Sequence, residues 1–161
     1  MSSGPAPWQR LMGLDYGDAR IGIAYASTLG VGSSMVLPAG FLAQKSDQDP
    51  AENVADMADE EGVDGIVLGI PYKGGEENAQ TRKVIAFAKH LREVLPERIP
   101  IYGWDESYSS TSAQFQLVEA ELKHSGKKHR GRVDSAAAAL ILQSFVDAHK
   151  NHSGVVGGLL I

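Results

Sequence analysis

One acidic residue inside an apolar strand–turn–strand segment constrains the fold and function of this chain more than any other feature. The segment reads LMGLDYGDARIGIAYA from residue 11 to residue 26, with two apolar arms around a glycine-containing turn. A carboxylate that leaves water costs free energy unless a cation or a metal ion compensates it. Asp15 lies inside the first apolar arm, so we interpret it as a functional residue. Asp18 lies in the turn, and we interpret it as an ordinary turn residue.

The composition is that of one soluble globular domain. The 161 residues are 43% hydrophobic and 22% charged, and they include no cysteine. The absence of cysteine excludes disulfides and thiolate chemistry, and it agrees with a reducing, cytoplasmic location. No apolar run approaches the roughly 20 residues that span a membrane. We expect residues 1–9 to form a flexible tail, residues 10–150 the domain, and residues 151–161 a C-terminal tail.

The order of the predicted elements indicates an α/β fold. We expect strands at 11–15, 21–25, 33–41, 63–70 and 99–104, and helices at 51–61, 77–95, 112–123 and 136–150. Pro38 and Gly40 favour an edge position for the third strand. The nearly continuous apolar run at 63–70 favours a central strand that is buried on both faces. An antiparallel start followed by strand–helix alternation predicts a mixed sheet with helices on its faces.

Three acidic residues lie where predicted elements begin or end. Asp15 is late in the first strand, Glu106 follows the last strand, and Asp134 precedes the last helix. Catalytic acids in such sheets lie beyond the carboxyl ends of the strands, so a central first strand would bring these three together. Carboxylates without histidine or cysteine favour Mg²⁺ or Mn²⁺. Two such ions suit the hydrolysis of a phosphodiester.

Each of these positions also has a purely structural interpretation. Asp134 is equally well placed to cap the last helix, and the two roles are compatible. Asp105 and Glu106 also suit a solvated turn. In an extended chain two adjacent side chains point to opposite sides, so only one of these acids faces the site. Arg20 either holds a phosphate with its planar guanidinium group or pairs with Asp18.

A basic run directly precedes Asp134. It is the one concentrated positive patch in a chain of formal net charge −5, so any binding of nucleic acid depends on a local patch of this kind. We interpret the run as a contact with a phosphate backbone rather than as a solvated loop. Its cationic residues are Lys123, Lys127, Lys128, Arg130 and Arg132.

Four segments resemble motifs of the YqgF family. They are LDYGDARIGIA at 14–24, VLGIP at 67–71, DESYSS at 105–110 and DSAAAALILQ at 134–143. They occur in the family's order, and the match spans residues 11–145. That family is described as Holliday-junction resolvases and as nucleases that mature the precursor of small-subunit ribosomal RNA.

The resemblance implies an RNase H-like fold whose five-stranded sheet has three antiparallel strands first and then two parallel strands. It implies that Asp15, Glu106 and Asp134 are the catalytic, metal-binding acids of a nuclease that uses Mg²⁺ or Mn²⁺. The family usually has arginine after its acid pair, where this chain has Ser107. Arg20, Arg82 and the basic run are the candidates to replace that charge. The partner is then RNA or branched DNA and not a membrane, and a homodimer is left open.

Two other functions share some of these features. The acidic charge balance and Ser107 also suit a non-catalytic nucleic-acid-binding or ribosome-maturation factor on the same fold. Actin-like and sugar-kinase ATPases also open with an Asp-x-Gly strand–turn–strand segment. That architecture needs two related halves around a nucleotide, and this chain shows no second Asp-x-Gly segment of that kind.

Overall fold

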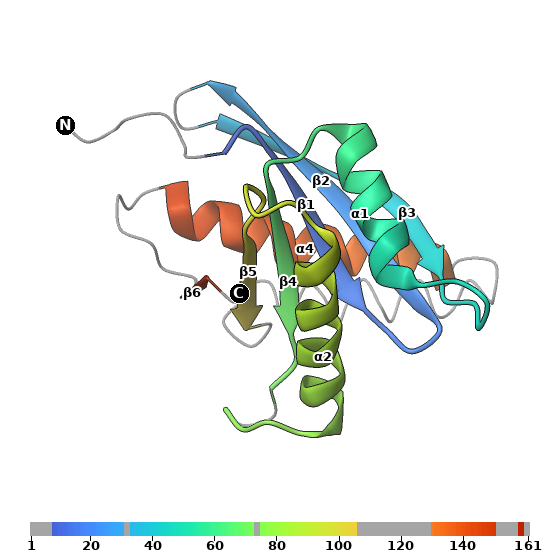
Figure 1. Cartoon of the computed structure of the whole chain (residues 1–161). Coiled ribbons are helices and arrows are strands. Elements are labelled where there is room, and N and C mark those ends of the chain that lie inside the picture. The colour runs from blue at the N-terminus through green and yellow to red at the C-terminus, as the bar shows by residue number, and fades with distance from the viewer. Residues whose placement is uncertain (1–7, 31–32, 73–74, 106–129, 151–157, 160–161) are drawn as a thin grey trace.

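A computed structural model describes residues 8–30, 33–72, 75–105, 130–150 and 158–159. Within these ranges the strands form one six-stranded sheet with helices on both faces (Figure 1). The elements in chain order are β1 (Arg10–Tyr16), β2 (Arg20–Gly30), β3 (Ser33–Ala43), α1 (Pro50–Glu61), β4 (Gly65–Ile70), α2 (Ala79–Val94), β5 (Ile101–Asp105), α4 (Arg130–Lys150) and β6 (Gly158–Leu159). The helix predicted at 112–123 lies outside the described residues.

The strand order in the sheet is β3-β2-β1-β4-β5-β6, so β1 is central. β1 pairs antiparallel with β2 and parallel with β4, while β2 pairs antiparallel with β3 and β4 pairs parallel with β5. This confirms the predicted mixed sheet and the edge position of the third strand. β6 was not predicted, because two residues are too few to show an alternation pattern. Its Leu159 pairs with Tyr102 on the outer side of β5.

The sheet separates two apolar layers. Met12, Leu14 and Ile101 belong to the layer under α1 and α2, whereas Leu11 and Trp104 belong to the layer under α4. Figure 1 shows α1 and α2 in front of the sheet and α4 behind it. Successive side chains of a strand point to opposite faces of the sheet. The layer to which one residue of a strand belongs therefore shows to which face its neighbours point. All six residues of β4 are buried, which confirms the prediction of a central strand covered on both sides.

The ends of α1 and α2 agree with the sequence signals. Asp49 caps α1 by accepting a hydrogen bond from the Ala51 backbone N–H, and Gly62 ends the helix at φ 65°. Glycine favours that left-handed conformation because it has no Cβ. Asn78 and Thr81 form a capping box at the start of α2. These two helices confirm the predictions to within about two residues at each end.

The last helix begins earlier than predicted. α4 starts at Arg130, so Asp134 is the fifth residue of the helix and not its N-cap. The N-cap interpretation of Asp134 is therefore wrong, because a cap precedes the first helical residue. Arg130 and Arg132 belong to the helix rather than to a linker. Arginine is among the better helix formers, so the basic composition of this stretch does not oppose the helix.

Candidate functional site

Asp15 lies near the carboxyl end of the central strand and is partly buried. It pairs with Gly22 across the β1–β2 ladder. Leu11, four residues earlier, belongs to the layer under α4. A Cβ atom on Gly13 would lie 2.8 Å from the Leu142 Cβ atom of α4. Because alternate residues share a face, the side chain of Asp15 points to the face of the sheet that α4 covers.

Hydrogen bonds hold the turn that follows Asp15. The Gly17 N–H donates to the Arg20 carbonyl oxygen at 3.0 Å, and a Cβ on Gly17 would lie 2.8 Å from that same oxygen. Gln44, just after β3, donates from its backbone N–H to the Ala19 carbonyl at 2.9 Å. Its side-chain amide donates to the Gly17 carbonyl. The turn is thus held on both of its arms, which restricts the strand end that carries Asp15.

Asp18 is the turn residue that the sequence predicted. It is exposed, and both of its carboxylate oxygens lie 3.3 Å from the Lys83 ammonium group of α2. Sequence reasoning gave Lys83 no role, because 65 residues separate it from Asp18 and no local pattern joins them. The pair places the first half of α2 beside the turn that follows Asp15.

Ser135 anchors the first half of α4 to the sheet. Its buried hydroxyl group donates to the Ile23 carbonyl oxygen at 3.2 Å and accepts from the Gly40 N–H at 2.9 Å. The β2–β3 register shifts between Gly22 and Ala24, so these two backbone groups lie at a β-bulge. Asp134 precedes Ser135 in the helix. The structure therefore brings the backbone of Asp134 to the face, and to the end of the sheet, where Asp15 lies.

The third predicted acid follows Asp105, the last residue of β5. Leu14 pairs with Leu68 and Ile70 pairs with Asp105, so Asp15 and Asp105 lie at the same carboxyl edge with β4 between them. Ile101 faces α1 and α2, whereas Trp104 faces α4. The pleat therefore directs Asp105 to the α1 and α2 face, opposite to Asp15. Glu106 lies outside the described residues.

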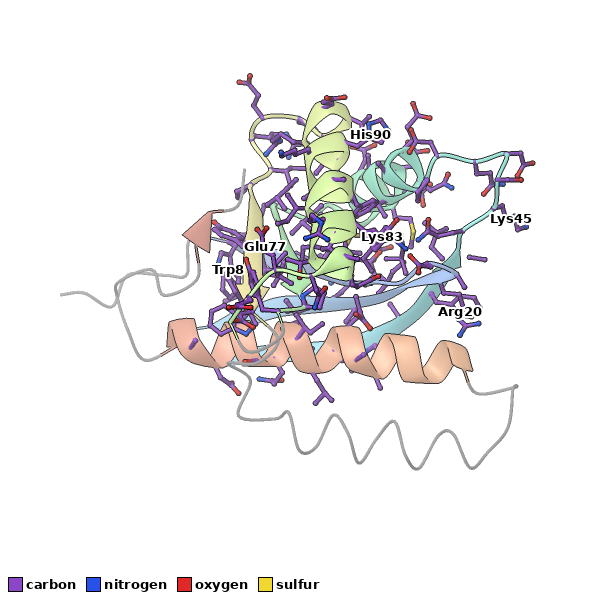
Figure 2. All side chains as sticks on the ribbon, turned by 90° about the horizontal axis from the view of Figure 1, so that it is seen from below. Trp8, Arg20, Lys45, Glu77, Lys83 and His90 are labelled. Carbon is purple, nitrogen blue, oxygen red and sulfur yellow. The ribbon has the colours of Figure 1, made fainter. Side chains whose placement is uncertain are left out.

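Arg20 opens β2 and lies on the same face as Asp15, because its neighbour Ile21 belongs to the layer under α1 and α2. Its guanidinium carbon lies 5.7 Å from the centre of the Phe41 ring of β3. Figure 2 shows Arg20 on the α4 side of the sheet, towards the end of α4 that is farther from Trp8. The predicted phosphate contact is thus on the side of the sheet where the acid points.

The other predicted cations are distributed differently. Arg82 is exposed on α2, on the face opposite to Asp15. Lys127 and Lys128 lie outside the described residues. Arg130 and Arg132 lie in the first turn of α4, and only their backbone is described. Arg82 therefore does not lie on the face of Asp15. Two residues of the basic run, Arg130 and Arg132, belong to α4, the helix that covers that face.

Among the described residues, no group of three or more histidine, aspartate or glutamate side chains could hold a metal ion. Two of the three predicted ligands, Glu106 and Asp134, have side chains outside that set. Asp15 contributes the carboxylate oxygen that Mg²⁺ and Mn²⁺ prefer. The metal site is therefore a prediction for which Asp15 is the one ligand with described geometry.

One pair of residues with shifted pKa values, His90 and Asp49, lies away from this site. Nε2 of His90 in α2 lies 2.6 Å from Oδ2 of Asp49, the cap of α1. The hydrogen bond with Asp49 raises the pKa of His90 and lowers the pKa of Asp49. This pair joins two helices on the face opposite to Asp15, and we interpret it as structural.

Known proteins similar to this chain are nucleases and resolvases by name. A protein of Syntrophus aciditrophicus, named "Putative pre-16S rRNA nuclease", is 37% identical over 140 residues, which are 86% of this chain and 89% of that protein. A protein of Chlamydia abortus with the same name is 34% identical over 149 residues, which are 90% of this chain and 95% of that protein.

Two solved structures share the fold. Thermus thermophilus RuvC in complex with a Holliday junction substrate matches with a TM-score of 0.56 and 12% identity over 88% of this chain and 96% of that one. The yeast mitochondrial Holliday junction resolvase Ydc2 matches with a TM-score of 0.55 and 12% identity over 94% of this chain and 84% of that one. These likenesses concern the fold, which is RNase H-like as predicted.

None of the helices in the described ranges is both long enough and apolar enough to cross a membrane.

The family model of RuvX, described as Holliday junction resolvase, matches residues 9–148. This match and the relatives confirm the family that the four motifs predicted, RuvX being the YqgF family. The chain belongs to the RuvX family of Holliday junction resolvases.

Proposed function

We propose that this protein is a metal-dependent nuclease that hydrolyses phosphodiester bonds in structured nucleic acid. The substrate is the precursor of 16S ribosomal RNA, branched DNA of the Holliday-junction type, or both. One observation carries the proposal: the partly buried carboxylate of Asp15 points from the carboxyl end of the central strand to the face where the first half of α4 is anchored. The names of the relatives support a nuclease, and the location proposed for this activity is the cytoplasm.

The proposed metal ligands are Asp15, Glu106 and Asp134. Asp15 is held by the turn that Gln44 braces, and Asp134 precedes the anchored Ser135. We prefer Glu106 to Asp105 because the family motif assigns the acidic role to Glu106, and because the pleat of β5 directs Asp105 to the face opposite to Asp15. Mg²⁺ or Mn²⁺ bound there would supply the charge that stabilises in-line displacement at a phosphodiester.

The protein's own cations hold the substrate strand in this proposal. Arg20 donates from its planar guanidinium group to a phosphate beside Asp15. Lys127, Lys128, Arg130 and Arg132 contact phosphates farther along the strand. Arg82 contacts the strand only where the substrate passes around the edge of the sheet, since it lies on the opposite face.

The test is cleavage of a four-way DNA junction, a plain duplex, a single strand and precursor ribosomal RNA, each with Mg²⁺ and with Mn²⁺. We expect Asp15→Asn to abolish cleavage and Asp18→Asn, three residues away in the exposed turn, to retain it. We expect Glu106→Gln to abolish cleavage and Asp105→Asn to retain it. Equal activity of the wild type and Asp15→Asn would overturn the proposal.

The same panel identifies the alternative function. A non-catalytic nucleic-acid-binding or ribosome-maturation factor would bind RNA or DNA in a salt-dependent way and cut nothing with either metal. Its binding would also survive Asp15→Asn.

A further inference from the structure

A large aromatic side chain is exposed on the same face as Asp15. The side chain of Phe41 in β3 is 47% exposed, although phenylalanine in a sheet is usually buried. Phe41 pairs with Gly22 of β2, and Gly22 pairs with Asp15 of β1. The three residues thus form one row across three neighbouring strands.

The register defines the face on which Phe41 lies. Its neighbour Leu42 packs against the layer under α1 and α2, so Phe41 points to the α4 side. Two other apolar side chains of β3, Met35 and Leu37, are 48% and 56% exposed. They pair with Ser27 and Tyr25, and therefore point to the opposite face. Phe41 thus lies on the face of the acid, whereas the other large exposed apolar side chains of the strand, Met35 and Leu37, lie on the opposite face.

The residue between Asp15 and Phe41 has no side chain. Paired residues of antiparallel strands have Cα atoms about 4.5–5.5 Å apart, so Asp15 and Phe41 lie about 10 Å apart across Gly22. Arg20 lies beside this row, with its guanidinium group over the Phe41 ring. A carboxylate, a glycine without a side chain, an arginine and an exposed aromatic ring therefore lie next to one another on one face of the sheet.

We propose that Phe41 is a stacking platform for an unpaired nucleobase of the substrate strand. The ring stacks on the base, Arg20 lies against the ring and the adjoining phosphate, and the strand then passes over Gly22 towards Asp15. Stacking on an aromatic side chain needs a base whose face is accessible, which loops, branch points and single strands provide and a continuous duplex does not. This inference deepens the proposed nuclease function and rests on it for the direction of the strand.

The test measures binding without cleavage. The probe is a hairpin oligonucleotide with the fluorescent base 2-aminopurine in its unpaired loop, prepared as DNA and as RNA and titrated in EDTA. The comparison probe carries 2-aminopurine inside a fully paired duplex. The variants are Phe41→Ala, Phe41→Trp, which keeps an aromatic ring, and Leu37→Ala, which removes an exposed apolar side chain from the opposite face of the same strand.

Wild-type protein should quench the loop fluorescence and bind the hairpin more tightly than the duplex. Phe41→Ala should lose the quenching and about 5- to 150-fold in affinity for the hairpin, the loss expected for one stacked base. Its affinity for the duplex should stay within about twofold of wild type. Phe41→Trp and Leu37→Ala should bind both probes as the wild type does. A melting temperature of Phe41→Ala equal to that of the wild type would show that the loss of hairpin affinity does not result from unfolding.

The outcomes separate this inference from the proposed function. Hairpin binding by Phe41→Ala that equals wild type, or quenching that persists without the ring, overturns the stacking platform whether or not the protein cleaves. Failure of the wild type to bind the hairpin overturns it as well. Loss of quenching in Phe41→Ala in a protein that cuts no substrate supports the platform and overturns the nuclease.

Discussion

The hydroxyl group of Ser135 in α4 donates a hydrogen bond to the carbonyl oxygen of Ile23 in β2 over 3.2 Å. The Ser135 hydroxyl oxygen itself accepts a hydrogen bond from the Gly40 N–H of β3 at 2.9 Å, at the place where the ladder between β2 and β3 is irregular. Backbone groups at a bulge lose their ladder partners, and burial without a partner costs free energy. The Ser135 side chain thus supplies hydrogen-bond partners to two backbone groups at the bulge, and these bonds fix the position of α4 along the sheet.

Removing this hydroxyl group should destabilise the protein. Ser135 is only 4% exposed, so Ser135→Ala leaves the Ile23 carbonyl and the Gly40 N–H without this partner in a dry environment. We expect a loss of about 1–3 kcal/mol in the free energy of unfolding, measured with urea. Gln143→Ala, which changes an exposed hydrogen bond of the same helix, should stay within about 0.5 kcal/mol. Equal stability of Ser135→Ala and wild type would contradict the anchoring role.

A methyl group on Gly13 should push α4 away from the sheet. Its Cβ would lie 2.8 Å from the Leu142 Cβ and 3.2 Å from the Ala138 carbonyl oxygen. Gly13→Ala should therefore cost about 1–3 kcal/mol through overpacking. In a double-mutant cycle with Leu142→Ala, the two losses should be less than additive, because the second change removes part of the obstructing side chain. Strict additivity would show that the contact does not limit the approach of the helix.

Gln44 should position Asp15 through the turn that follows this acid. It donates to both arms of the turn that follows the acid, and Gln44→Ala removes the side-chain bond to Gly17. Loss of a residue that orients a ligand typically weakens metal binding by about 10- to 100-fold. We expect such a loss for Mn²⁺, measured by calorimetry, with a stability loss of no more than about 1.5 kcal/mol. Lys45→Ala, the adjacent exposed residue, serves as the matched control. Wild-type Mn²⁺ affinity in Gln44→Ala would contradict the positioning role.

The contact between His90 and Asp49 predicts a pH dependence of stability. The hydrogen bond with Asp49 raises the pKa of His90 above the unfolded value of about 6.5, so its contribution is present below that pH and is lost as pH rises through the folded pKa. The lowered pKa of Asp49 makes its contribution present above about pH 3.9 and lost as pH falls through the folded pKa. The pair thus stabilises the protein most between these limits.

Thermal melting checks this dependence. The difference in melting temperature between wild type and His90→Gln should be larger near pH 6 than near pH 8.5, on either side of the ordinary histidine pKa. Lys89→Gln, one residue away, should show the same difference from wild type at both pH values. A His90→Gln difference that does not change with pH would mean that the pair contributes no linked stabilisation.

Much of the fold was predictable because its signals are local. The apolar run of β4 and the turn after Asp15 depend on residues that are close in sequence. The ends of α1 likewise follow from local residue types, since Asp49 caps its start and Gly62 ends it. The mixed sheet then follows from the order of the elements, since short connections leave few topologies. The start of α4 was misplaced because its first turn contains arginines that a loop would carry equally well.

The amino-acid sequence alone predicts most of the strands and helices, their order, the family motifs and Asp15 as the residue around which a site is built. The folded sheet shows which side chains share a face: Arg20 and Phe41 lie on the face of Asp15, while Asp105 and Arg82 lie on the other. It also shows that Ser135 anchors α4. Propensity and periodicity are properties of neighbouring residues, whereas the face and the register of a strand depend on packing against segments that are distant in the chain.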